Sequence, residues 1–201
     1  LVFSLREIIR YDLNYNIKII YVLLLMLLLP VTVIKAQDEA RITALLTEAD
    51  ALVNKNNLAE ALTKTKAALH ISPGSHPALQ KQINIYFLMN DEKEAERVVD
   101  EAIRKYPDIP GYHYLRGVIN NSKGKYIRAL DNFNQAINLN APDILYRCYL
   151  GRGVSHMNLL EYEQALADFS TSIEQNDTVA STYHSRAMVN YELHYYLAAI
   201  T

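Results

Sequence analysis

The sequence of 201 residues has no tryptophan, one cysteine, and only six glycines and six prolines. Because Cys148 is alone, no disulfide can form within the chain and no cysteine-based metal site can be assembled. The low glycine and proline content argues against an all-β fold, whose many turns use both residues, and favours helices. The formal net charge is only −2, so the chain lacks the basic excess typical of proteins that bind nucleic acids.

Signatures of common enzymes are absent as well. The sequence contains no Gly-x-Ser-x-Gly, no phosphate-binding loop and no Gly-x-Gly-x-x-Gly. Its six histidines form no pair with metal-ligand spacing, and packing between helices accounts for His113 and His184. Cys148 has no motif around it and is expected to pack as a small apolar residue. The sequence therefore predicts no catalytic, metal or cofactor site, and the chain is not expected to be an enzyme.

The first 36 residues have the parts of an export signal. Basic residues precede a continuous apolar run over residues 19–29, and a small residue, Ala36, stands before the polar stretch. This order predicts a secretory signal peptide, cleaved before Gln37. The alternative is an uncleaved membrane anchor through residues 19–34, although these 16 residues are short of the roughly 20 that span a membrane. Either interpretation predicts an exported chain, periplasmic or extracellular, or anchored at a membrane.

A small residue recurs at a nearly fixed interval along the rest of the chain. The interval is 34 residues in three cases and 36 in one, between Ala61, Ala95, Ala129, Ala165 and Ala199. A fixed period of this size is the signature of a solenoid. Neighbours four and seven residues later recur too, at spacings that place them on one helix face. These neighbours are Thr65, Val99, Phe133 and Phe169, and then Ala68, Ala102, Ala136 and Ser172.

A second marker precedes each of these alanines by twelve residues and lies in another apolar stretch. The second markers are Ala49, Ile83, Gly117, Gly153 and Ala187. Polar or glycine-containing breaks separate the two stretches at 54–57, 89–93 and 122–125. Each unit is therefore predicted to be a helix, a tight turn and a second helix. Prolines mark the connections to the next unit, because proline commonly stands just past the end of a helix; they are Pro73, Pro107 and Pro142.

These residues resemble the tetratricopeptide repeat (TPR), a 34-residue unit with small residues and an aromatic at set positions. The third and fourth units match most fully, through Gly117, Ala129, Phe133 and Ala136, and through Gly153, Ala165, Phe169 and Ser172. The second unit departs from the pattern with Ile83 in place of a small residue, the third has two extra residues, and the fourth ends in Asp177 where the family has proline.

The resemblance implies an all-α fold. It predicts a right-handed α-solenoid of stacked antiparallel helix pairs over residues 37–201, with about four and a half units. The units are expected at about 42–75, 76–109, 110–145, 146–179 and, truncated, 180–201.

The resemblance also implies a binding surface. In TPR proteins the first helix of each unit lines a concave surface that holds peptides or other protein segments. Asparagine side chains can pair with a peptide backbone, and tyrosine and methionine supply contact area. The plainer alternative for each residue is packing against the neighbouring helix. The matching positions here are Asp50, Asn84, Tyr114, Val118, Asn121, Arg147, Met157, Asn158, Met188 and Tyr191.

Chaperone-binding members of the family hold a terminal carboxylate with lysine and asparagine. The first unit has Leu46 and Asp50 at the matching positions, so this clamp is not expected.

Three arginines, Arg116, Arg152 and Arg186, recur in phase on the first helices. Pairing with acids such as Asp131 or Asp168 is the structural interpretation of these arginines, and a strip that binds anions is the functional one.

The sequence favours an exported, non-catalytic scaffold whose partners are protein or peptide segments. One alternative is the recognition half of a larger enzyme or sensor whose active domain follows residue 201, because the last unit stops without the polar cap that solenoids need. The other is a TPR protein held at a membrane through residues 19–34.

Overall fold

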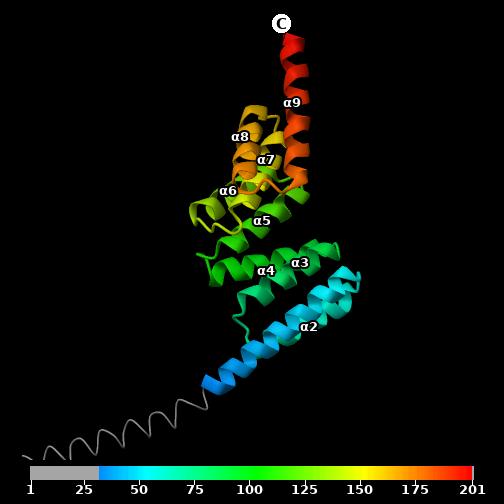
Figure 1. Ribbon diagram of the computed structural model, residues 1–201, viewed down its shortest axis with the longest axis vertical. Coiled ribbons are helices and arrows are strands. Elements are labelled where there is room, and N and C mark those ends of the chain that lie inside the picture. Colours follow the sequence, from blue (N-terminus) through cyan, green and yellow to red (C-terminus); the bar gives the residue numbers. More distant parts are fainter. Residues whose placement is uncertain (1–31, 201) are drawn as a thin grey trace, which may run out of the picture.

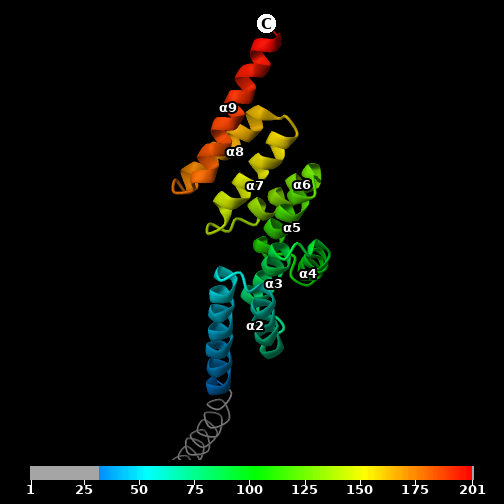
Figure 2. The same ribbon diagram turned by 90° about the vertical axis from the view of Figure 1, so that its right-hand side faces the viewer.

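The computed structural model describes the backbone of residues 32–200 and the side chains of residues 32–194. All regular elements in this part of the chain are helices, which stack as antiparallel pairs along one axis (Figure 1). A first helix over residues 32–54 lies beside the second one, as Figure 2 shows. The others are α2 (Leu58–Ile71), α3 (His76–Leu88), α4 (Glu92–Lys105), α5 (Pro110–Ser122), α6 (Tyr126–Asn138), α7 (Leu145–Asn158), α8 (Tyr162–Gln175) and α9 (Ala180–Ile200). The predicted fold class, an α-solenoid of helix pairs, is confirmed.

The contacts between helices explain which surfaces the fold exposes. From α2 to α9, each helix packs on the next one along the chain, and α3, α5, α7 and α9 also pack on one another in order. The second helices of the units, α2, α4, α6 and α8, have no close contacts among themselves. The first helices therefore share one continuous face, and the second helices form the opposite layer.

Small residues let the two helices of a unit approach closely. Phe133 on α6 is fully buried, and a Cβ atom added to Gly117 on α5 would lie 2.7 Å from its ring. A Cβ atom on Gly151 of α7 would lie 2.5 Å from the same ring, so Phe133 is held between two bare stretches of backbone. Glycine inside a helix costs about 1 kcal/mol relative to alanine, and this contact accounts for its use. The predicted packing face of the second helices is confirmed; Ala61, Thr65, Ala95, Val99, Ala129, Ala165 and Phe169 are all fully buried.

The turn inside a unit is the same in four units. One residue in each turn has a left-handed backbone conformation: Asn56, Asn90, Gly124 and Leu160, with φ of 57°, 56°, 67° and 63°. In the third unit, Gly124 N–H donates to Asn121 C=O at 3.0 Å, and Lys125 N–H donates to Asn120 C=O at 2.8 Å. The other three turns repeat both bonds. This Schellman motif satisfies the last carbonyls of one helix, and the residue that follows it is the N-cap of the next.

The connections between units are four residues long except one. They cover 72–75, 106–109 and 176–179, whereas the α6–α7 connection covers the six residues 139–144. The two extra residues of the third unit therefore lie in this connection, where Asn140 is left-handed with φ of 49°. Helices α3, α5, α7 and α9 begin at residues 76, 110, 145 and 180, at or one residue from the expected starts of the units.

Helix α9 differs from the other first helices. It continues through His194, which corresponds to the left-handed residue of the other units. Ala187 on α9 is exposed, whereas Ala49, Ile83 and the two glycines at this repeat position are buried.

The structure describes only residues 32–36 of the predicted export segment. Residues 1–31, which include the whole apolar run over residues 19–29, lie outside the described part of the chain. The predicted cleavage point after Ala36 falls within the exposed first helix. None of the helices that the structure describes is both long enough and apolar enough to cross a membrane.

Leu160 is the one left-handed turn residue that is neither glycine nor asparagine, and it is 70% exposed. A left-handed conformation costs most L-residues about 1 kcal/mol or more, but glycine and asparagine tolerate it. Leu160→Asn is therefore expected to raise the free energy of unfolding by about 0.5–1 kcal/mol, measured by urea denaturation. Gly124→Ala, at the same repeat position, should lower it by a similar amount. A loss of stability in Leu160→Asn would contradict the strain argument.

Candidate functional site

Two adjoining pockets lie on the face formed by the first helices. One, of about 280 Å³, lies where α3, α5 and α7 meet and is lined by Asn84, Tyr114 and Arg147. The other, of about 520 Å³, lies between the first helix and α3 and is lined by Asp50 and Asn84. Gln80 and Asn84 line both pockets. Together the two pockets form a continuous surface, called the groove below, that draws residues from four units.

Repeat geometry and one irregular connection build the groove. Asp50 and Asn84 are 34 residues apart, as are Gln80 and Tyr114, so successive first helices present them on the same side. Gln80 and Asn84 share one face of α3 because residues four apart do so in a helix. Asp143 and its neighbours in the α6–α7 connection line the 280 Å³ pocket. The lengthened connection therefore supplies part of the groove wall.

Several polar side chains of the groove have hydrogen-bonding capacity to spare. Within the part of the chain that the structure describes, the amides of Gln80 and Asn84 and the hydroxyl of Tyr114 form no hydrogen bond with another residue. Burial raises the pKa of Tyr114, so its hydroxyl stays protonated and able to donate. Arg147 also lines the smaller pocket, and it donates one bond from Nε to the Tyr146 hydroxyl at 2.8 Å. At the other end of the groove, Lys81 is ion-paired with Asp50.

The remaining predicted groove residues lie elsewhere. The Asn121 amide donates to Gly151 C=O at 2.9 Å and accepts from the Ser155 hydroxyl at 2.7 Å, so it joins α5 to α7. Asn158 donates to Val154 C=O in its own helix. Met157 packs against the core around Phe169, and Val118 is half-buried. Met188 and Tyr191 are exposed on α9 and line neither pocket.

Sequence reasoning missed Gln80, Lys81 and Asp143. Gln80 had a usable signal, because it stands four residues before Asn84 on the same helix face and 34 before Tyr114. Asp143 had none, since it lies in the connection that departs from the repeat.

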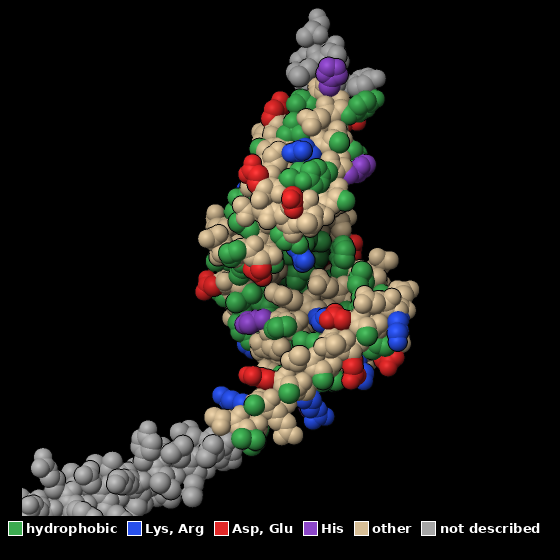
Figure 3. Space-filling model, viewed as in Figure 1, with side chains coloured by type: hydrophobic (Ala, Val, Ile, Leu, Met, Phe, Trp, Pro, Cys, Tyr) green, Lys and Arg blue, Asp and Glu red, His purple; other side chains and the backbone are tan. Residues whose placement is uncertain are grey.

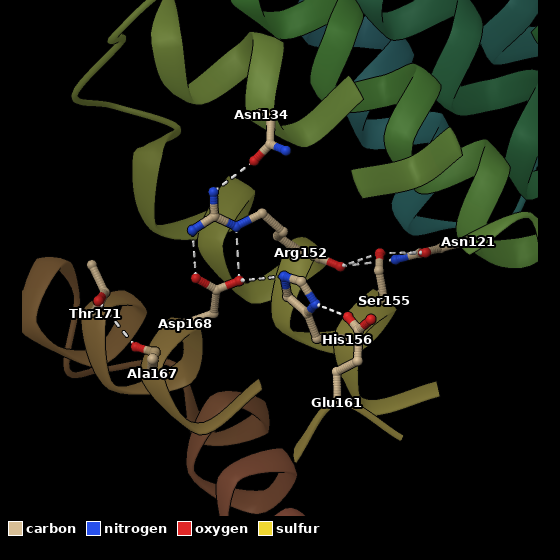
Figure 4. A network of polar contacts seen from close by, with 10 residues as sticks. Asn121, Asn134, Arg152, Ser155, His156, Glu161, Ala167, Asp168 and Thr171 are labelled. Atoms are coloured by element: carbon tan, nitrogen blue, oxygen red, sulfur yellow. Dashed lines mark hydrogen bonds and ion pairs between the residues drawn. The ribbon is translucent and has the colours of Figure 1, made fainter. Parts of the chain in front are cut away.

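Two of the three recurring arginines, Arg116 and Arg152, form ion pairs, and Figure 4 shows those of Arg152. Arg152 donates to both carboxylate oxygens of Asp168, at 2.8 and 2.6 Å, and to the Asn134 side chain at 2.7 Å. His156 lies beside this pair, with Nδ1 2.6 Å from Glu161 and Nε2 3.8 Å from Asp168. The structural interpretation is thus confirmed for Arg152.

Arg116 finds a different partner from the expected one. It bonds Glu96 at 2.9 Å and Asp100 at 3.0 Å, both on α4 of the preceding unit. The expected pairing with Asp131 is not formed, because Arg116 points to α4 and Asp131 is exposed on α6. Arg186 stacks on the ring of Tyr183. Figure 3 shows side chains of both charges scattered over the face in view, with no single-sign strip.

Removing the acid of the buried pair tests its structural role. Asp168 is 5% exposed and accepts two charged hydrogen bonds. Asp168→Asn is expected to lower the free energy of unfolding by about 1–3 kcal/mol, because hydrogen bonds to charged groups are lost. The control Asp131→Asn, on an exposed carboxylate, should change it by less than about 0.5 kcal/mol in the same denaturation experiment. Equal effects of the two substitutions would show that the pair does not stabilise the fold.

The histidines and the cysteine show no cluster suited to chemistry. Among the described residues, no group of three His, Cys, Asp or Glu side chains is placed to hold a metal ion. His113 is buried with Nε2 2.7 Å from Pro107 C=O, as expected of a packed side chain, whereas His184 is exposed. Cys148 is fully buried, as predicted.

Burial raises the pKa of the Cys148 thiol to about 12. The thiolate is the reactive form, so almost none is present near neutral pH. Labelling of the folded chain by a disulfide reagent is expected to be far slower than labelling in denaturant, where the thiol regains its ordinary pKa. Equal rates in the two conditions would contradict the buried placement.

Comparisons with known proteins agree with this architecture. A family model described as the TT21 fifth ARM repeats domain matches residues 43–141. The structure of PilF from Pseudomonas aeruginosa is similar with a TM-score of 0.69 and 18% identity, over 80% of this chain and 72% of that one. YrrB, titled a TPR protein with an unusual peptide-binding site, has a TM-score of 0.54 and 21% identity, over 75% and 76%. The first TPR of Spaghetti (RPAP3), bound to the HSP90 peptide SRMEEVD, has a TM-score of 0.54 and 21% identity, over 58% of this chain and 90% of that one. No curated protein matches.

The fold is a tetratricopeptide-repeat solenoid. Armadillo repeats also stack helices, but their units have about 40–47 residues. The units here are pairs of helices that recur every 34 or 36 residues, with the small and aromatic positions of the TPR in its packed core.

Proposed function

We propose that this chain is an exported, non-catalytic TPR scaffold that holds an extended segment of a partner protein in the groove. The observation that carries the proposal is the pair of unpartnered amides, Gln80 and Asn84, where the two pockets join. A side-chain amide offers both a donor and an acceptor, which is what the backbone of an extended peptide requires. A peptide crossing α3 would meet both amides.

The rest of the groove suits a peptide as well. Val53, Phe87 and Leu88 give the larger pocket apolar walls for a side chain, and Leu88 is 52% exposed. Tyr114 and Arg147 add donors in the smaller pocket. Binding sites commonly combine apolar walls with a few placed polar groups in this way.

The similar structures support the ligand class. The printed descriptions of YrrB and of the RPAP3 domain each mention a peptide or a peptide-binding site. In this chain, Leu46 and Asp50 occupy the positions where the family's carboxylate clamp has lysine and asparagine, and Asp50 carries a negative charge. We infer that the ligand is recognised along its length rather than by a terminal carboxylate.

Export rests on the apolar run and its basic flank. Sequencing the N-terminus of the mature protein tests it: a chain that begins at Gln37 supports cleavage and release, and a retained leader supports a membrane-anchored scaffold. A mature protein found in the cytosol would overturn both.

The groove can be tested with selected peptides. Short random peptides displayed on phage are selected on the full chain, and the affinity of the best binders is then measured on variants. Asn84→Ala combined with Gln80→Ala should weaken binding about thirtyfold, because two hydrogen bonds of about 1 kcal/mol each are lost. Asn158→Ala, a control outside the groove, should leave it unchanged. Peptides that bind the double variant as well as the parent would place the site elsewhere, and turnover of a small molecule by a chain that captures no peptide would overturn the scaffold role.

A further inference from the structure

A second surface lies on the turn edge of the third and fourth units, away from the groove. Ile127 and Leu160 are 69% and 70% exposed, the largest exposures among the large hydrophobic side chains that the structure describes. Ile127 lines a shallow pocket of about 390 Å³ together with Gly124, Lys125, Tyr126, Arg128 and Leu159, and Leu160 follows directly in the chain. This pocket, called the turn pocket below, shares no lining residue with the groove.

Packing within the repeat does not explain these two apolar residues. The other units have Ala59, Lys93 and Glu163 at the position of Ile127. At the position of Leu160 the first three units have asparagine or glycine, which suit its left-handed backbone. Leu160 therefore strains the turn and buries little of its own surface. An apolar side chain that contributes neither to the core nor to the turn is suited to contact with another molecule.

The rim of the turn pocket is positively charged. Arg128 forms no ion pair or hydrogen bond with the described residues, and the other units have Glu60, Glu94 and Gln164 at its position. Lys125 lies 3.9 Å from Glu96, but closer cations already hold that carboxylate. These are Arg116 and Lys123, at 2.9 Å each. The nearby Glu161 is bonded to His156. Two cations with spare charge thus border an apolar concavity.

We propose that the turn pocket docks a segment of a partner protein in which a bulky apolar side chain is flanked by aspartate or glutamate. The apolar side chain fills the space between Ile127 and Leu159, and the acidic neighbours pair with Lys125 and Arg128. A protein segment fits better than a membrane surface, because the turn edge is not apolar throughout. The turn of the first unit, over residues 54–57, consists of Asn, Lys, Asn and Asn.

The test uses phage-displayed random peptides selected on the full chain, followed by affinity measurements on single variants. Peptides that lose binding to both Ile127→Ser and Arg128→Glu should carry Asp or Glu next to Leu, Ile or Phe. Their affinity should fall about tenfold in Arg128→Glu and decline with added salt. The groove variant Asn84→Ala and the variant Glu163→Gln, at the repeat position of Ile127 in the fourth unit, should bind them as the parent does. Unchanged melting temperatures by circular dichroism would show that the variants are folded.

Three results would overturn the proposal. The first is a selection in which no peptide depends on Ile127 and Arg128, or in which the dependent peptides have no excess of acidic residues. The second is binding of phosphatidylserine vesicles, but of no peptide, that is lost in Ile127→Ser. The third is a self-association of the parent chain that Ile127→Ser abolishes, since the pocket would then be filled by a second copy.

Discussion

The contact of a phenylalanine ring with bare helix backbone determines the spacing of this solenoid. Phe133 lies between Gly117 and Gly151, so one side chain fixes the distance of α6 from both its own first helix and the next one. Phe169 makes the same contact with Gly153. A larger residue at any of these glycines would push the helices apart, because interiors are close-packed and the ring has no free space to move into. The register of each unit on its neighbour follows from this contact.

That register in turn produces the groove. Because equivalent residues of successive first helices face the same side, polar residues that differ between units line up across α3, α5 and α7. The lengthened α6–α7 connection interrupts the regularity at one place only, and there it supplies Asp143 to the wall. Most of the groove is therefore formed by equivalent positions on successive first helices, and one part of its wall comes from the α6–α7 connection. The polar residues that line it contribute little to the core.

The fold could be predicted from the sequence because close packing restricts a few positions to small residues, and these repeat. The turns could be predicted because polar and glycine-containing breaks recur at the same phase. The groove was only partly predictable. Asp50, Asn84, Tyr114 and Arg147 line it as predicted, whereas the side chain of Asn121 donates to Gly151 C=O and joins two helices instead. Arg116 was expected to pair with an acid such as Asp131 or Asp168, but it pairs with Glu96 on α4. A long side chain at an interface between units can reach either neighbour, and the pattern of residues does not say which.

The contacts between helices also bear on how the chain acquires its structure. No helix from α2 to α9 packs on one more than two places away along the chain, so every contact joins segments close in sequence. Chains dominated by such local contacts fold quickly, because closing a short loop to form each contact costs little conformational entropy. Folding can therefore begin in one pair of neighbouring units and extend from unit to unit along the chain.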